Sequence, residues 1–440
     1  MNELEPGSDL WWFNRLWVKL SRAAPEAALY NSWVAGDPPI PAPDNDKPGF
    51  ERLQRIARVN VAGLIVEARL HRLQLLGAET GSDSSADGDD IVRRFFVEQD
   101  LKRKFQVAFR DALVCGHGYL VFSEAGVLVS SPANTVVEED SFGRTVAALT
   151  VRYDPVLGRQ AMVLMRPGYS VQAVTKSAYA KLLPANHGVS FLPSSWEFQD
   201  PVENSFEGVP VYAVGDGQSL IAKHLPTLER INHGVLQRLI LIAMQAFRQR
   251  AITNAPDRDE HGQEIDYDNL FESAPDALWM LPEGTSIWES ASTDFTPVLV
   301  AVRDDLKVLA VESKTPNYMI SPDDANGSAE GAHAQRETLI FDVEALIASF
   351  EGVIKRFISD VLVSLGEAER ADVSNMQLLW ANPRRSSVME RAEAARAASD
   401  AGVPFRLVMK NFAELTPEEV EQAMQGRVED VYHEVVKGVG

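Results

Sequence analysis

The sequence predicts an α+β fold built from about three structural units. Apolar residues recur at three- and four-residue steps in the first 113 residues and again after residue 219, which is typical of amphipathic helices. Between these blocks, short apolar runs alternate with turn residues from Gly118 to Met165, which indicates strands. One long helical stripe runs from Leu339 to Leu365 and predicts a very long helix.

Composition and charge exclude several classes of protein. The 440 residues include 42 Lys and Arg against 63 Asp and Glu, a net charge of −21, and this excess argues against a general nucleic-acid binder. Hydrophobic residues at 45% exclude global disorder. The longest apolar run, Leu239 to Met244, is far shorter than the ~20 residues that cross a bilayer, and the N-terminus lacks a signal-peptide pattern. The single cysteine, Cys115, allows no internal disulfide, so we expect an intracellular soluble protein.

The first quarter of the chain is predicted to be helical. Helices are expected over residues 10–24, 50–76 and 90–113. Asp9 is the expected cap of the first helix and Pro25 its expected end. A proline-rich connector over 38–43 follows, and the acidic segment 81–90 is expected to be a solvated loop because it contains no large apolar residue.

The pattern then changes to short strands. They are expected over residues 118–122, 127–130, 134–138, 145–153, 160–165 and 210–214. The connections between the strands up to residue 165 are too short for a parallel crossover, which needs a dozen or more residues, so these five strands are predicted to form an antiparallel meander, with the strand at 210–214 expected separately.

From residue 219 onward helices are expected again. The first begins at about residue 219, with apolar residues recurring from Leu228 to Ala246. The others cover 296–312, the long stripe, 388–401 and 404–412, and Thr416-Pro417-Glu418-Glu419 fits a capping box. A mixed acidic segment over 254–289 includes an expected strand at 277–281, and another strand is expected at 376–380. Pro316 is expected to end a helix, and residues 317–331 have the composition of a loop.

Motifs for bond chemistry are missing from the sequence. It contains no Walker loop, no Gly-x-Ser-x-Gly elbow, no dinucleotide-binding glycine loop and no histidine pair at metal-ligand spacing. Cys115 and His117, with the carboxylates of residues 138–140, could form a thiol or acid–base site. We favour a small buried residue before a strand and a solvated hairpin end, and we assign no catalytic, cofactor-binding or metal-binding residue.

Several strings, in their order along the chain, resemble those of a known family. They are Asn60–Leu70 (NVAGLIVEARL), Gly116–Val121 (GHGYLV), Leu225–Asn232 (LPTLERIN), the segment Pro316–Gly331 with the long helix after it, and the tail Gly402–Glu429. In this order they resemble the portal (head–tail connector) proteins of tailed bacteriophages, and those of long-tailed phages most. The resemblance covers most of the chain, and it depends on the order of the motifs more than on any one of them.

The resemblance implies a portal fold, assembled as a ring, usually of twelve subunits, at one capsid vertex. Its parts would be an α/β wing (1–215), the first stem helix (216–251), a small mixed clip (252–294), the second stem helix (295–315), a tunnel loop (316–330), the long helix with a returning wing strand (331–386) and a short helical crown (387–440).

The resemblance also implies a function without catalysis or cofactor. The ring would conduct double-stranded DNA during packaging and ejection. It would dock terminase and head-completion, adaptor or tail proteins, and contact the major capsid protein and scaffold. The expected location is the virion, with the host cytoplasm during assembly and no membrane. DNA-channel candidates are Arg303, Lys307, Lys314, Asn317, Tyr318, Asn326 and Ser328, and clip docking candidates are Asp257, Asp259, Glu260, Glu264, Asp266 and Asp268.

Two alternatives remain open at this point. The chain could be another head–tail adaptor or tail structural protein, or an enzyme with its site near Cys115. The acidic charge is compatible with a ring, because walls that hold DNA weakly let it slide.

Overall fold

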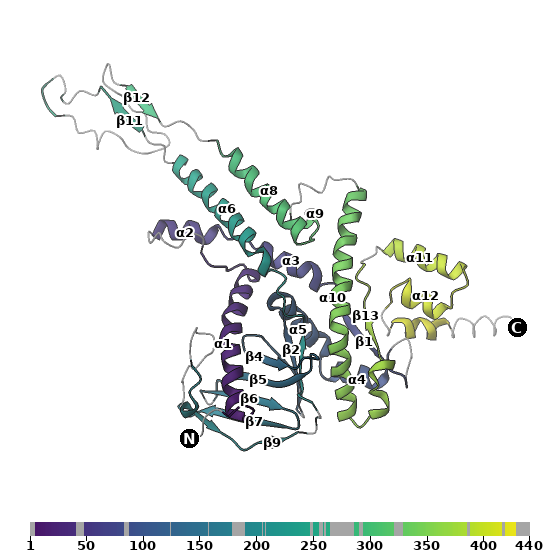
Figure 1. Ribbon diagram of the computed structural model, residues 1–440. Helices are drawn as coiled ribbons and strands as arrows, with labels where there is room; N and C mark the ends of the chain where they lie inside the picture. The colour runs from purple at the N-terminus through teal and green to yellow at the C-terminus, as the bar shows by residue number, and fades with distance from the viewer. Residues whose placement is uncertain are drawn as a thin grey trace. The chain divides into compact units, whose positions relative to one another are not determined.

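The computed structural model of the chain describes residues 5–40, 48–82, 88–123, 125–156, 158–177, 190–204, 206, 208–246, 250–254, 258, 261–264, 286–289, 294–320, 329–384, 388–415 and 419–427. The chain divides into two compact units, and Figure 1 labels most of their helices and strands. Unit 1 contains Met1–Pro39, Asn60–Leu228 and Lys307–Gly440, and unit 2 contains Ile40–Val59 and Glu229–Leu306. Both helices and strands are present, which confirms the α+β class.

A six-stranded antiparallel sheet packed against helix α1 (Asp9–Val34) forms one core of unit 1. Its strands are β4 (Thr135–Glu139), β5 (Thr145–Asp154), β6 (Arg159–Arg166), β7 (Tyr169–Thr175), β8 (Trp196–Phe198) and β9 (Val202–Glu203). The order β4-β5-β6-β7-β8, with β9 also paired to β7, confirms the predicted meander for the strands from 134 to 165. The strands predicted at 118–122 and 127–130 belong to a different sheet, so a single meander through all of them was wrong. Strands β7, β8 and β9 were not predicted.

Helix α1 differs from the prediction at both ends. Its cap is Ser8, whose hydroxyl accepts a hydrogen bond from the Trp11 N–H, and Asp9 is the first helical residue. The helix continues through Pro25, so the predicted end there is wrong. Proline removes one helical hydrogen bond, but Ala27, Trp33 and Val34 beyond it are buried, and this burial offsets the loss.

The predicted helix over 50–76 is also wrong, because it consists of three elements. Helix α2 (Pro48–Ile56) lies in unit 2, whereas α3 (Val61–Leu70) and strand β1 (Leu75–Glu79) lie in unit 1. Asn60 starts α3, since its side-chain oxygen accepts a hydrogen bond from the Gly63 N–H at 2.9 Å. Strand β1 pairs antiparallel with β13 (Gln377–Trp380), a partner about 300 residues away along the chain.

The predicted helix over 90–113 is divided into α4 (Asp90–Glu98) and α5 (Leu101–Cys115). Asp100 stands between them with φ of 51°, a left-handed conformation that a continuous helix does not contain. Asp89 caps α4, because its carboxylate accepts from the N–H groups of Ile91 and Val92.

A three-stranded sheet lies next to α5. Its order is β10 (Val211–Val214), β2 (Gly118–Ser123) and β3 (Gly126–Ser130), all antiparallel. A Cβ atom at Gly118 would lie 2.0 Å from the carbonyl oxygen of Ala108, so this position requires glycine. This close approach gives a physical reason for the glycine in the GHGYLV string.

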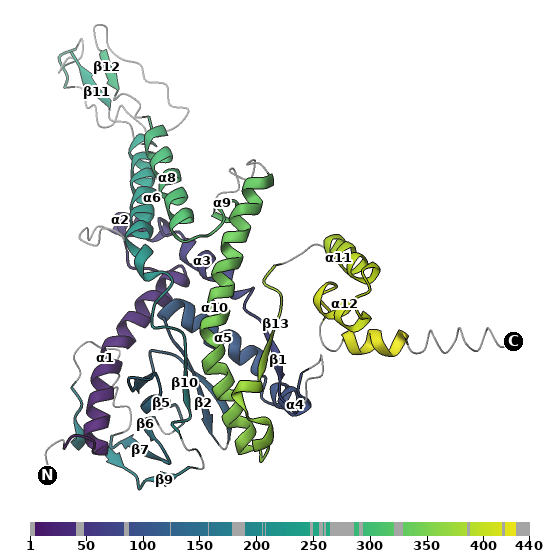
Figure 2. The same ribbon diagram turned by 45° about the vertical axis from the view of Figure 1, so that its right-hand side comes forward.

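The long helix α10 (Ala329–Ser364) contains 36 residues and confirms the predicted stripe. It starts inside the segment that was expected to be a loop. It passes close to α5 and β10 (Figure 2). Aromatic rings join it to α5, with centroids 5.4 Å apart for Phe109 and Phe350 and 5.8 Å apart for Phe105 and Phe357.

Unit 2 contains a pair of helices and a small β-ribbon. Helix α6 (Leu225–Ala246) belongs to it from Glu229 onward, and α8 (Thr296–Glu312), with the predicted bounds, belongs to it up to Leu306. Strands β11 (Arg250–Thr253) and β12 (Ser286–Glu289) form the antiparallel ribbon. The expected strand at 277–281 lies outside the described residues.

The two helices of unit 2 contact each other directly. Arg230 of α6 donates to Asp305 of α8 at 2.8 Å. A Cβ atom at Gly234 would lie 2.7 Å from Cγ2 of Val302, so glycine lets the helices approach closely. Ala57, Val235 and Leu236 form the buried centre of this unit, with Phe50 and Leu53 of α2 packed against it.

The remaining elements of unit 1 are short. They are η1 (Pro193–Ser195), η2 (Ala222–His224), α9 (Asn317–Ile320), η4 (Ala368–Arg370), η5 (Val373–Asn375), α11 (Val388–Asp400) and α12 (Phe405–Asn411). Helices α11 and α12 agree with the predicted pair and share a small core of Ala395, Ala398 and Val408. In the described parts of the chain, no helix combines the length and the apolar character needed to span a bilayer.

Candidate functional site

The structure describes some of the residues predicted from the sequence to be functional. Five DNA-channel candidates, Arg303, Lys307, Lys314, Asn317 and Tyr318, lie on α8, on α9 or in the turn between them. Asn326 and Ser328 lie outside the described residues. Of the clip candidates, Glu264 is described and exposed, with a backbone bridge to Arg258. The others, Asp257, Asp259, Glu260, Asp266 and Asp268, lie outside the described residues.

The segment predicted to be a loop from residue 317 is helical at both ends. Helix α9 begins at Asn317, directly after Pro316, and α10 begins at Ala329. Proline at this point favours a helix start because its φ is already close to the helical value. The Asn317 N–H donates to the side-chain oxygen of Gln335 at 3.0 Å, so α9 is tied to α10.

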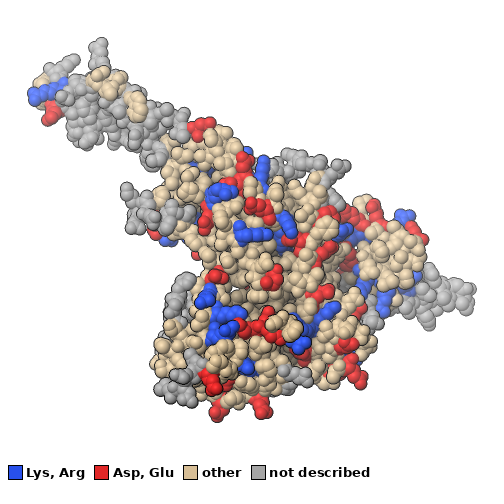
Figure 3. All heavy atoms as spheres, in the orientation of Figure 1, with Lys and Arg blue, Asp and Glu red and all other residues tan. Residues whose placement is uncertain are grey.

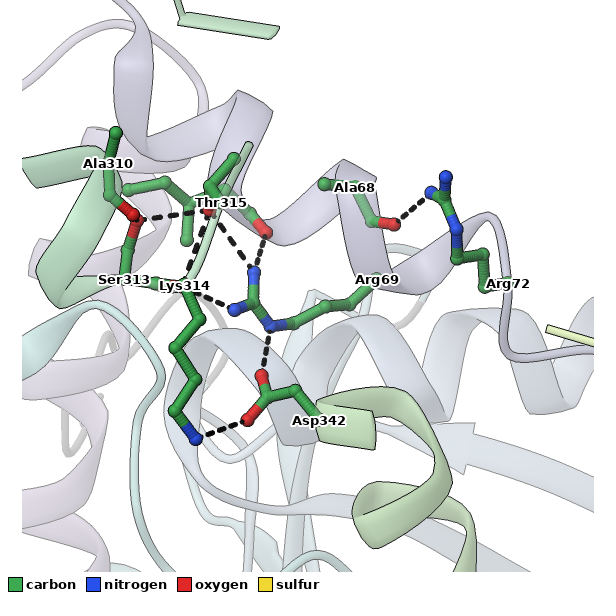
Figure 4. A network of polar contacts seen from close by, with 9 residues as sticks. Ala68, Arg69, Arg72, Ala310, Ser313, Lys314, Thr315 and Asp342 are labelled. Atoms are coloured by element: carbon green, nitrogen blue, oxygen red, sulfur yellow. Dashed lines mark hydrogen bonds and ion pairs between the residues drawn. The ribbon is translucent and has the colours of Figure 1, made fainter. Parts of the chain in front are cut away.

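Arg69 is the centre of the polar network at this turn, and the sequence prediction did not include it among the site residues. Its side chain is fully buried, and it comes from α3 (Figure 4). Its Nε donates to Asp342 Oδ2 of α10 at 2.7 Å, and its Nη1 donates to the Ile65 carbonyl at 3.0 Å. Its Nη2 donates to the carbonyl of Ser313, and Nη1 also approaches the hydroxyl of Thr315. One guanidinium therefore joins α3, the end of α8 and α10.

Lys314 is engaged in the same network, whereas it was predicted to be a cation facing the DNA. Its Nζ lies 2.9 Å from Asp342 Oδ1, and its backbone has a left-handed φ of 52°. Burial by itself would raise the pKa of Asp342, but Arg69 and Lys314 hold this pKa below its ordinary value. Asp342 thus stays charged and bridges one buried cation and one half-exposed cation.

A cavity of about 190 Å³ lies beside this turn. Its lining residues are Ala310, Val311, Lys314, Thr315, Pro316, Asn317, Gln335 and Thr338. The network and the cavity lie at the turn that connects α8 to α9, next to α10. This arrangement fixes the turn between α8 and α9 against α3 and α10, and it contains no set of groups for bond chemistry among the residues described.

Arg69 could have been found from its helical register. It follows Ile65 by four residues and Val61 by eight, so it lies on the buried face of α3. A charged side chain on such a face has to be paired. The sequence could not identify the partner, because Asp342 is 273 residues away.

The residues of the enzymatic alternative lack the activation that this chemistry needs. Burial, together with the charge of Asp111, raises the pKa of the Cys115 thiol to about 12, whereas a nucleophilic thiol needs a lowered pKa. Burial lowers the pKa of His117. Glu138 is held in ion pairs with Arg15 and Lys19 of α1, at 2.5 and 3.1 Å. No cluster of three or more potential metal ligands occurs within the described ranges.

Exposed apolar side chains are concentrated along α8. The exposed large hydrophobic residues on this helix are Leu299, Val300, Val308 and Val311. Val311 is 74% exposed, although Leu309 and Ala310 next to it are buried. Single exposed apolar residues are normal, but Leu299 and Val300 in unit 2, and Val308 and Val311 in unit 1, leave apolar area on this helix that a partner could bury.

Charge on the visible face of the molecule is mixed. Lys and Arg are interspersed with Asp and Glu there, without a continuous basic stripe (Figure 3). A basic stripe is the feature that a tight duplex-binding surface requires.

Comparisons with known proteins add little. No family model matches the chain. No curated protein matches it. Among solved structures, it is similar to a chain of one described as "Neck of native GTA particle computed with C12 symmetry". The identity is 10%, over 86% of this chain and 95% of that one, with a TM-score of 0.40. A likeness of this degree assigns neither the fold nor the function of this chain.

Proposed function

We propose that this protein is a portal (head–tail connector) subunit, which assembles into a closed ring at one vertex of a phage capsid. The observation that carries the proposal is the order of elements along the chain. Helices α6 and α8 are paired, with the β11–β12 ribbon between them in sequence, and α8 is followed by α9 and the 36-residue α10. This is the order that the sequence resemblance to portals requires.

The surface of α8 supports assembly into a ring. Leu299, Val300, Val308 and Val311 expose apolar area that a neighbouring copy would bury. A ring repeats one heterologous contact, so each subunit uses two different faces, and the rotation has to close.

In the proposed ring, DNA passes through the channel and the protein performs no bond chemistry. The subunit's net charge of −21 favours weak contact with the duplex, because the walls attract few phosphates. Arg303 and Lys307, both exposed on α8, remain the candidate channel cations. Terminase, head-completion proteins, the capsid protein and scaffold are the proposed partners, and the virion is the proposed location.

The test is the mass and shape of the purified full chain. We expect negative-stain images and mass photometry to show rings, with twelve copies as the central expectation from the portal resemblance. A Val311→Asp variant should lower the ring fraction at least tenfold, since a charge at a buried contact costs more than ~1.4 kcal/mol.

The matched control is Val156→Asp, because Val156 is 90% exposed in a turn of the sheet. This control should assemble like the parent chain. Monomers at all concentrations and salt conditions, or equal ring fractions for the two variants, would contradict the proposal.

A further inference from the structure

His224 is a buried histidine with unsatisfied ring nitrogens. It is the last residue of η2, directly before α6, and it is 2% exposed. Neither Nδ1 nor Nε2 has a hydrogen-bond partner within the part of the chain that the structure describes. A buried polar group without a partner is costly, so such a group calls for a physical explanation.

The charged groups around His224 come from three elements. Lys223 precedes it in η2, Glu312 ends α8, and Arg69 comes from α3. The Glu312 carboxylate lies 3.7 Å from His224 Nδ1, which is close for an ion pair but too long for a hydrogen bond. The Glu312 side chain is half exposed and therefore has room to move.

Glu312 connects His224 to the Arg69 network through the backbone. The backbone carbonyl of the next residue, Ser313, accepts a hydrogen bond from the Arg69 guanidinium. A shift of Glu312 toward His224 would therefore move the acceptor that Arg69 holds. All of these residues belong to unit 1.

We propose that His224 and Glu312 form a proton-operated contact that releases the end of α8 from Arg69. At neutral pH, His224 is uncharged and the Ser313–Arg69 contact is intact. When the imidazole takes up a proton, Glu312 closes on the imidazolium, and the turn at residues 312–315 opens. The proposal concerns the single subunit, so it stands or falls independently of ring formation.

The direction of the pH effect follows from the surroundings. Burial lowers the pKa of His224, Lys223 and Arg69 lower it further, and Glu312 opposes them. A base whose pKa is lowered in the closed state binds its proton more readily in the open state. The closed state is therefore favoured above about pH 6.5 and loses this advantage as the pH falls below it.

The test is hydrogen exchange of residues 308–320 in the full chain, at about pH 7.5 and about pH 5.5, corrected for intrinsic exchange. In the parent protein we expect the opening of this segment to increase severalfold at the lower pH. In His224→Gln, the opening should not depend on pH. In Glu312→Gln, the increase should be smaller than in the parent, because the imidazolium loses the carboxylate that draws residue 312 toward it and away from Arg69.

His233→Gln is the matched control, since His233 lies exposed on α6 and contacts Gln237. It should behave like the parent protein. A parent protein without acid-induced opening, or an unchanged opening in His224→Gln, would overturn the proposal.

A second measurement covers the case in which the His224 variant does not fold. NMR titration of the His224 ring in the parent protein should give a pKa below the ordinary value of about 6.5. It should also show a chemical-shift change at Ser313 over the same pH range. A His224 pKa at or above the ordinary value would refute the mechanism.

Discussion

The core under α1 and the Arg69 side chain at the centre of its junction are both buried, but different forces hold the two regions together. Under α1, Phe13, Leu16 and Trp17 pack against the apolar face of the meander. This attraction has no preferred direction, so residues of similar volume can replace one another. Around Arg69, one guanidinium meets a carboxylate and two backbone carbonyls from three segments. These hydrogen bonds stabilise the junction in only one arrangement, because the loss of any partner leaves a buried polar group unsatisfied.

The largest expected effect tests this difference directly. Arg69→Met should reduce the free energy of unfolding by about 3–5 kcal/mol, because it leaves Asp342 and the Ser313 carbonyl without their buried donor. Arg69→Lys should recover little of this stability, since a lysine ammonium group cannot donate to all the acceptors that the planar guanidinium reaches. Leu16→Met in the apolar core should cost less than ~1.5 kcal/mol. Urea denaturation followed by circular dichroism measures all three variants.

The double variant Arg69→Met with Asp342→Leu serves as the control. It should regain part of the loss, because both charges are removed together. If Arg69→Lys is as stable as Leu16→Met, the distinction between the two regions is lost.

A smaller effect is expected at Asp111, which is buried without being well paired. Burial raises its pKa to about 6, and Arg110 opposes this only in part. The folded state therefore binds the proton more tightly than the unfolded state. The contribution of Asp111 to the free energy of unfolding is fully present below about pH 4 and is lost as the pH rises through about 6.

Asp111→Asn should remove this dependence. At about pH 7.5 the variant should be more stable than the parent by about 2–3 kcal/mol, and the gain should shrink toward pH 4. Thermal unfolding at several pH values measures it. A variant that is destabilised at pH 7.5 would show that the Asp111 carboxylate has a favourable partner in the folded state.

The smallest effect is expected at Lys314. Its side chain is 54% exposed, and Asp342 keeps its ion pair with Arg69 when Lys314 is removed. Lys314→Met should therefore change the free energy of unfolding by less than about 1 kcal/mol. A loss comparable to that of Arg69→Met, in the same urea titration, would mean that the two cations are equally necessary.

Much of the local structure was predictable, because the period of the apolar residues shows which face of a segment is buried. The bounds of α8 and the strands of the meander up to β6 follow from this signal. The breaks at Asn60 and Asp100 were missed, because the apolar pattern continues across both. Helix α1 passes Pro25 because later residues are buried, and a local rule about proline does not include that burial.

The candidate site was predictable only in part. The turn at Lys314 and Asn317 was identified, but its role was interpreted as contact with a passing duplex. Its observed partners, Asp342 and Gln335, lie on a helix that begins after the intervening segment. No spacing rule connects groups that are 18 or 28 residues apart.

The sequence by itself determined the α+β class, the long helix, the bounds of α8 and the acidic charge of this protein, because each depends on residues that are neighbours along the chain or on their sum. Tertiary structure decided which distant groups meet. Arg69 is one arginine on an apolar helix in the sequence. It becomes the centre of a junction because folding places the end of α8 and Asp342 of α10 around it. A buried charge has to find a partner, but its position along the chain does not say which one.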